Sequence, residues 1–293
     1  MKRFLFYITY AFLWVVAWLP LPILYLLSDF TYFIIYYLVR YRVKTTRQNI
    51  RRAFPTQTSA EQRKIERDFY HHLCDYGLES IHMMHMSDRE MRKHVNFKNT
   101  DLLIELGKEN KSIIALFGHY CNWEWVSSLP LYTHDSLNIS TLYKTLTNPY
   151  FDQFFINLRS RFGTYCYPKQ RVLRGMSELK SLNKPFVLAF IADQTPSGNG
   201  LHFWTNWLNQ DTPFFTGWET IAHKINCPVV FLEMRKIKRG YYQFTVEMLC
   251  EKPNEQKPFE LTEQYARRME QNILINPAYW LWSHRRWKHH RTN

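Results

Sequence analysis

The sequence predicts an α/β fold: a mixed, mostly parallel sheet flanked by helices, with an N-terminal membrane-anchoring helical segment. Three observations lead to this prediction. Residues 4–27 contain no charged side chain. From about residue 112 onward, short apolar runs alternate with helical stretches, a pattern typical of α/β domains. The chain has 293 residues, of which 46% are hydrophobic, enough to bury a large core.

The apolar stretch at the N-terminus predicts contact with a membrane. At 1.5 Å per helical residue, residues 4–27 are long enough to cross a hydrocarbon core of about 30 Å. Pro20 and Pro22 are expected to kink or break this helix near its end, and residues 28–42 resume as a second, interfacial stretch. No signal-peptide cleavage site is visible. We therefore divide the chain into a membrane anchor with an interfacial helix, 1–42, and a globular domain, 43–293.

The basic residues around this segment bear on its orientation. Lys2 and Arg3 precede the apolar run, and a larger cluster follows it: Arg40, Arg42, Lys44, Arg47, Arg51 and Arg52. The positive-inside rule places the larger cluster, and the domain after it, in the cytoplasm. If the first pair also stays inside, the segment forms a hairpin instead of a single span. The sequence leaves both arrangements open.

Composition narrows the partners and excludes some site types. The net charge of +13 favours an anionic partner, and the 10 Trp, 19 Tyr and 21 Phe favour a membrane interface. No RNA-binding motif is present, so nucleic acid is not expected as a partner. The five scattered cysteines contain no CxxC pair and predict neither a zinc site nor a disulfide framework. His82 and His85 have a metal-ligand spacing, but we expect them to pack on a helix face.

Strands and helices are predicted from apolar periodicity and turn residues. A helix is expected from about residue 60 to 94, and further helices after Asn122, Asn148, Gln170, Thr216 and Thr262. The last two predicted strands flank a Lys-Arg-Gly turn and are expected to form an antiparallel hairpin. The predicted strands are 112–117, 138–143, 185–191, 228–235 and 241–249.

A histidine and a glutamate follow the first of these strands, in GHYCNWEW (118–125). This is the carboxyl edge of the sheet, where ligands bind in open α/β domains. With Asn122 as a plausible helix cap, Glu124 is expected to accept the imidazole N–H of His119 and fix its tautomer. The other ring nitrogen is then available to take a proton from a hydroxyl. The spacing alone is weak evidence in a chain with 12 histidines.

Several further motifs, taken in their order along the chain, support a functional role for His119 and Glu124. GHYCNWEW resembles the H-x4-(D/E) block of the lysophospholipid-acyltransferase-like superfamily, and more closely that of the late acyltransferases of lipid A biosynthesis, the lauroyl and myristoyl transferases. The resemblance covers nearly the whole chain. It extends over RQNIRRAFP (47–55), NPYFDQFFINLRSRFG (148–163), FIADQTPSGNG (190–200), TPFFTGWETIAHKINCPVV (212–230) and YWLWSHRRWK (279–288).

This resemblance implies an O-acyl transfer in which His119, held by Glu124, deprotonates an acceptor hydroxyl that attacks a thioester. It implies acyl carrier protein as the donor, a lipid acceptor in the membrane, and no cofactor, metal or covalent acyl-enzyme. It further implies a bacterial inner-membrane location with the catalytic domain facing the cytoplasm. Cys121 next to the base suggests a Cys-His nucleophile, but a residue inside the spacer is expected to point away from His119.

Four more residues are candidates for substrate binding. Arg159 and Arg161 lie in the block where these enzymes are thought to hold phosphate or other anionic groups, although either alone suits a solvated helix face. Asp193 ends a strand and is expected to orient an arginine, line the pocket or cap the next loop. Gln194 lies on the expected rim of the site. The cationic, aromatic residues 284–290 suit anionic head groups or the surface of an acyl carrier protein.

Other functions remain open at this point. The acceptor is a lipid A precursor in the common family reaction, but the Trp-rich stretch 201–210 lies where members vary, so a phospholipid or aminolipid is an alternative. A second class of function is a non-catalytic, membrane-anchored binder of anionic lipid. A metal-dependent hydrolase is the weakest alternative because the chain has no HExxH motif.

Overall fold

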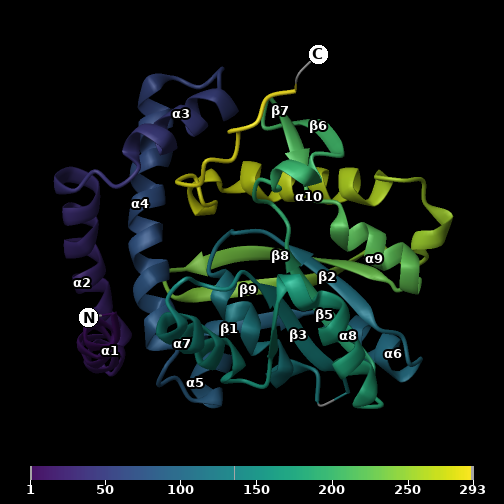
Figure 1. Cartoon of the computed structure of the whole chain (residues 1–293). Coiled ribbons are helices and arrows are strands. Elements are labelled where there is room, and N and C mark those ends of the chain that lie inside the picture. Colours follow the sequence, from purple (N-terminus) through teal and green to yellow (C-terminus); the bar gives the residue numbers. More distant parts are fainter. Residues whose placement is uncertain (1, 135, 292–293) are drawn as a thin grey trace.

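Seven strands form one mixed sheet in the computed structural model, which describes residues 2–134 and 136–291. Their order is β1-β9-β8-β2-β5-β3-β4, and all neighbours are parallel except β8 and β9. The predicted α/β fold with a mixed, mostly parallel sheet is confirmed (Figure 1). The strands are β1 Val95–Lys98, β2 Ile113–Phe117, β3 Asn138–Tyr143, β4 Tyr165–Pro168, β5 Phe186–Ile191, β8 Val229–Lys238 and β9 Tyr241–Cys250.

Helices cover the sheet and extend along one side of it. In Figure 1, α10 passes above the strands, α5 and α7 lie below them, and α4 stands upright beside α2. The helices are α1 Lys2–Ala17, α2 Leu21–Phe33, α3 Val43–Ala53, α4 Ser59–His82, α5 Asp88–His94, α6 Thr100–Lys108, α7 Pro149–Ser160, α8 Val172–Ser181, α9 Gly217–Ile225 and α10 Glu260–Ile275. The predicted range 60–94 is thus two helices, α4 and α5.

The predicted strands and hairpin are present, and the unpredicted strands are short. β2, β3, β5, β8 and β9 match the five predicted runs to within a few residues, and β8 pairs with β9 antiparallel around Gly240, whose φ is 75°. The sequence analysis missed β1 and β4, which have only four residues each. It also missed the separate two-stranded sheet of β6 Phe203–Trp207 and β7 Gln210–Phe214.

The N-terminal helices differ from the prediction in where the second helix begins. α1 ends at Ala17 and α2 begins at Leu21, because Pro20 has φ −58° and ψ 146° and so takes the extended conformation at the helix start. The break at Pro20 agrees with the expectation, but the second helix begins at Leu21 and not at residue 28. α2 continues into the π-helix η1 Ile34–Leu38, and residues 21–38 are long and apolar enough to cross a membrane by length and composition. Few of their side chains are buried.

Ion pairs attach α2 to the rest of the molecule. Arg239, in the β8–β9 turn, donates to Asp29 of α2 at 2.6 Å and to Asp75 of α4 at 2.7 Å. Lys236 also donates to Asp75, at 3.2 Å. Burial by itself raises the pKa of Asp75, but the hydrogen bonds from Arg239 and the charge of Lys236 outweigh it and hold the pKa below its ordinary value. The Asp75 carboxylate is therefore the shared anchor of α2, α4 and the hairpin.

We expect Arg239→Ala to lower the free energy of unfolding by about 1–2 kcal/mol, because it removes charged hydrogen bonds from Asp75 and Asp29. Denaturation in detergent at pH 7 measures this. Because the folded-state pKa of Asp75 is lowered, its stabilising interaction is complete above about pH 4 and is lost as the pH falls through the folded-state value. The effect of the substitution should therefore shrink below about pH 4.

The matched control is Arg235→Ala, on the same hairpin. Arg235 pairs with Glu233 at 2.7 Å, but half of its side chain is exposed, and such surface pairs contribute little. Equal losses in the two variants at pH 7 would contradict a special role for the Arg239 contacts.

Candidate active site

The candidate active site is a cavity of about 840 Å³ at the carboxyl edge of the sheet. β2, β5, β3 and β4 lie side by side in this order and run parallel, so their carboxyl ends meet at one edge. The residues that follow them line the cavity: His119 after β2, Gln194 after β5, Lys144 after β3 and Lys169 after β4. This is the edge where open α/β sheets bind ligands, as predicted for His119.

A buried carboxylate holds His119 in place. Asp193 Oδ1 lies 2.7 Å from His119 Nδ1, and Asp193 Oδ2 accepts the His119 backbone N–H at 2.8 Å. Trp280 Nε1 donates to the same Oδ2 at 2.8 Å. The Asp193 side chain is almost fully buried, whereas that of His119 is 18% exposed. The imidazole is thus fixed on one side by Asp193 and open to the cavity on the other.

The same contacts keep Asp193 ionised. Burial by itself raises the pKa of its carboxyl group, but the charge of His119 and the hydrogen bonds from His119 and Trp280 outweigh burial and lower it. Gly118 makes this close arrangement possible, because a Cβ atom there would lie 2.4 Å from Met269 Cε and 3.1 Å from Asp193 Oδ2. The strand-to-turn geometry therefore depends on a residue without a side chain.

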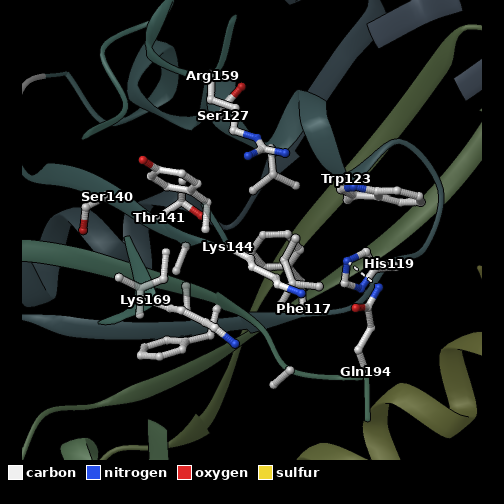
Figure 2. A pocket seen from close by; sticks show the side chains of 18 of the residues that line it. Phe117, His119, Trp123, Ser127, Ser140, Thr141, Lys144, Arg159, Lys169 and Gln194 are labelled. Carbon is white, nitrogen blue, oxygen red and sulfur yellow. Dashed lines mark hydrogen bonds between the residues drawn. The ribbon is translucent and has the colours of Figure 1, made fainter. Parts of the chain in front are cut away.

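The prediction that Glu124 holds the imidazole is wrong for this structure. Glu124 is 4% exposed and accepts two hydrogen bonds from Arg159 of α7, from Nε at 2.7 Å and from Nη2 at 2.6 Å. The cause lies in the turn: Cys121 has a left-handed φ of 51°, and a 3-10 helix, η2 Trp123–Tyr132, follows. As a result Trp123 packs edge-on against His119 (Figure 2), while Glu124 faces Arg159.

The other predicted site residues separate into those inside the cavity and those outside it. Gln194 lines the cavity, and its Nε2 lies 3.1 Å from His119 Nε2 (Figure 2). Arg159 also lines the cavity. Arg161 instead donates through Nε and Nη2 to the backbone oxygen of Met86 and is not part of the cavity wall. Asp193 orients a histidine, not an arginine as expected.

The sequence analysis missed Trp280 and misplaced the C-terminal segment. Leu281 donates its N–H to the His119 carbonyl at 3.1 Å, and Cys121 donates to Tyr279 at 3.0 Å. Within 284–290, Arg286 and Trp287 are buried, whereas Arg285 and Lys288 are exposed, so only part of this segment is available to an anionic partner. The motif YWLWSHRRWK was recognised as significant, but nothing in its composition indicates that it packs under the catalytic turn.

Two alternative chemistries find little support in these side chains. Cys121 is fully buried, and burial raises the pKa of its thiol well above its ordinary value, so it stays protonated. His82 is bound to the Ala17 carbonyl and to Glu90, while His85 stacks on Trp18, which agrees with the packing role expected for both. Within the described ranges, no group of three or more His, Cys, Asp and Glu forms a metal-ligand cluster.

Part of the cavity wall is apolar and formed by residues of the core. Side chains from three strands and η2 contribute to it, including Ala115, Val126, Leu129, Ile139 and Ala189. These side chains are buried, and no charged residue lies among them. The cavity therefore offers an ionisable ring at one place and a water-poor, hydrocarbon-like surface at another.

Comparison with known proteins identifies the family. A search of curated proteins finds no match. The family model described as "Bacterial lipid A biosynthesis acyltransferase" matches residues 1–289, nearly the whole chain. The resemblance of the sequence motifs and the position of His119 at the sheet edge agree with this match. The chain belongs to the bacterial lipid A biosynthesis acyltransferase family.

Proposed function

We propose that this protein transfers a fatty acyl chain from an acyl carrier protein thioester to a hydroxyl group of a lipid A precursor in the membrane. Family membership implies acyltransferase activity in lipid A biosynthesis; the donor and the mechanism are our proposal. One observation carries it. His119 has one ring nitrogen on a buried, ionised carboxylate and the other at a large, partly apolar cavity.

The partner of Nδ1 sets the tautomer of the imidazole. Because the pKa of Asp193 is lowered, its carboxylate only accepts hydrogen bonds at neutral pH, so Nδ1 carries the proton. The lone pair then lies on Nε2, which faces the cavity. The Gln194 amide nitrogen, 3.1 Å away, donates to this lone pair. In the proposed reaction a substrate hydroxyl replaces the amide at Nε2.

The proposed reaction has two steps. His119 Nε2 takes the proton of the acceptor hydroxyl as its oxygen bonds to the thioester carbon, and the carbonyl π electrons move to oxygen. The tetrahedral intermediate then re-forms the carbonyl and breaks the carbon–sulfur bond. The thiolate leaves with the sulfur electrons and takes the proton from the imidazolium. Asp193 stabilises the imidazolium between the steps and keeps its own charge.

Arg159 is proposed to stabilise negative charge in the cavity. Glu124 binds its Nε and Nη2, while its Nη1 makes no hydrogen bond to the described part of the chain. The guanidinium is mostly buried, so its field is less screened than that of a surface residue. Glu124 thus becomes a positioning residue for Arg159 instead of an orienter of His119.

The proposed membrane location rests on the exposed apolar side chains of α1 and α2. These side chains lie on the surface of helices attached to the catalytic domain, and they include Phe4, Leu5, Ile8, Phe12, Val15, Leu26 and Phe30. An inner-membrane location with the catalytic domain in the cytoplasm agrees with the basic cluster that follows. We keep the division into an anchor, 1–42, and a catalytic domain, 43–293, as part of this proposal; residues 1, 135 and 292–293 lie outside the described residues.

His119→Ala should reduce acyl transfer to background, and Asp193→Asn should lower kcat by about 10²–10⁴, because the amide no longer enforces the tautomer with its proton on Nδ1. The assay combines purified protein in detergent, labelled acyl carrier protein thioester and a lipid A precursor. Cys121→Ala serves as the control and should retain turnover. Full transfer by His119→Ala would refute the assignment of the base.

Glu124 and Arg159 should behave as one unit. Each single alanine variant leaves an unpaired charge in a mostly buried place, so we expect its free energy of unfolding to fall by about 2–4 kcal/mol. The loss in the double variant should be much smaller than the sum of the two single losses. Glu124→Gln should lower kcat more than it raises KM, with the pH dependence from His119 unchanged. A shifted acid limb of the pH profile in Glu124→Gln, matching that of Asp193→Asn, would instead place Glu124 on the imidazole.

A further inference from the structure

Two lysines remain as uncompensated cations in the cavity. Glu124 binds Nε and Nη2 of Arg159, and the Met86 carbonyl binds Arg161. Lys144 and Lys169 line the cavity, and neither makes an ion pair or hydrogen bond with residues 2–134 or 136–291. Figure 2 shows both side chains extending into the space below Arg159, with His119 and Gln194 on the far side.

The strand register places these lysines next to each other. Tyr143 of β3 pairs with Pro168 of β4, so Lys144 and Lys169 are the residues that directly follow a matched pair. Neighbouring parallel strands lie about 4.8 Å apart, and two ammonium groups at adjoining strand ends repel each other. The acidic residue of this region, Asp152, already accepts from the Leu146 N–H at 2.7 Å and from Tyr143. In the described part of the chain, neither lysine forms an ion pair with Asp152 or with any other acidic side chain.

We propose that Lys144 and Lys169 bind a phosphate ester of a substrate, an inference that rests on the proposed function. Two monovalent cations match the charge of one phosphate group, whose oxygens accept hydrogen bonds from both. In the strand order β2-β5-β3-β4, the lysines stand two and three strands from His119, or about 10 and 14 Å along the edge.

Two substrates of the proposed reaction can supply such a phosphate. One is the lipid acceptor, if it carries a phosphate on its head group. The other is the thioester donor, whose pantetheine arm is joined to its carrier through a phosphodiester. Both groups present phosphate oxygens that accept hydrogen bonds from the lysines, although the diester carries one negative charge and a monoester up to two. The experiment separates the two sources.

The test measures binding in the His119→Ala background, so that no turnover interferes. Three probes are used: 4′-phosphopantetheine, a phosphorylated lipid A precursor in detergent micelles, and the same lipid after phosphatase treatment. Titration calorimetry measures the dissociation constant of each. Lys144→Gln with Lys169→Gln should weaken one phosphorylated probe about 10-fold for each lysine. It should leave the dephosphorylated lipid unchanged. Lys144→Arg with Lys169→Arg should restore most of the affinity.

The matched control is Lys180→Gln with Lys184→Gln. Lys180 lies in α8, Lys184 precedes β5 at the opposite edge of the sheet, and neither lines the cavity. Loss confined to the lipid assigns the site to the acceptor, and loss confined to 4′-phosphopantetheine assigns it to the donor. Affinities within twofold of the parent for every probe would overturn the proposal. If the unmodified chain transfers no acyl group but binds a probe through these lysines, the proposed function fails and the phosphate site stands.

Discussion

The carboxylate of Asp193 joins three segments that are far apart in the sequence. It receives hydrogen bonds from the backbone and ring of His119 after β2 and from Trp280 near the C-terminus, while its own backbone follows β5. A buried anion is costly unless such donors surround it. The donors on His119 belong to the turn after β2, and the donor on Trp280 belongs to the C-terminal segment. The charge that orients the imidazole therefore also fixes the shape of the site.

A buried cation, Arg286, interacts electrostatically with Asp193 at longer range. Arg286 is fully buried between the rings of Trp207 and Phe214, and Nη2 donates to the Pro213 carbonyl. Burial lowers its pKa to about 10, while the charge of Asp193 acts in the opposite direction. Its charge thus persists at neutral pH, and aromatic faces partly replace the water it has lost. Within the basic motif at the C-terminus, Arg286 is therefore an internal charge, whereas Arg285 and Lys288 are exposed.

Periodicity predicted the central strands and the edge at which His119 lies, because these properties depend on local apolar patterns. It did not predict β1 and β4, since four-residue strands carry too little pattern, nor the partner of His119. That partner is 74 residues away and depends on β5 pairing beside β2. Glu124 has the nearer position in sequence, but the left-handed Cys121 and the 3-10 helix direct it to Arg159. Tertiary contacts determine which residue pairs with His119, and the spacing of residues along the chain does not reveal these contacts.

The helix α7 lies between α1 and the cavity. One of its faces packs against α1, where Phe6 contacts Tyr150 and Phe151, and Tyr10 contacts Phe154. The other face contributes Phe155 and Arg159 to the cavity wall. A helix with its side chains is about 10 Å across, so this is the thickness of protein between the α1 contact and the cavity. Under the proposed function, a lipid acceptor anchored beside α1 needs to carry only its head group past one helix to reach His119, which explains why the anchor packs on this part of the catalytic domain.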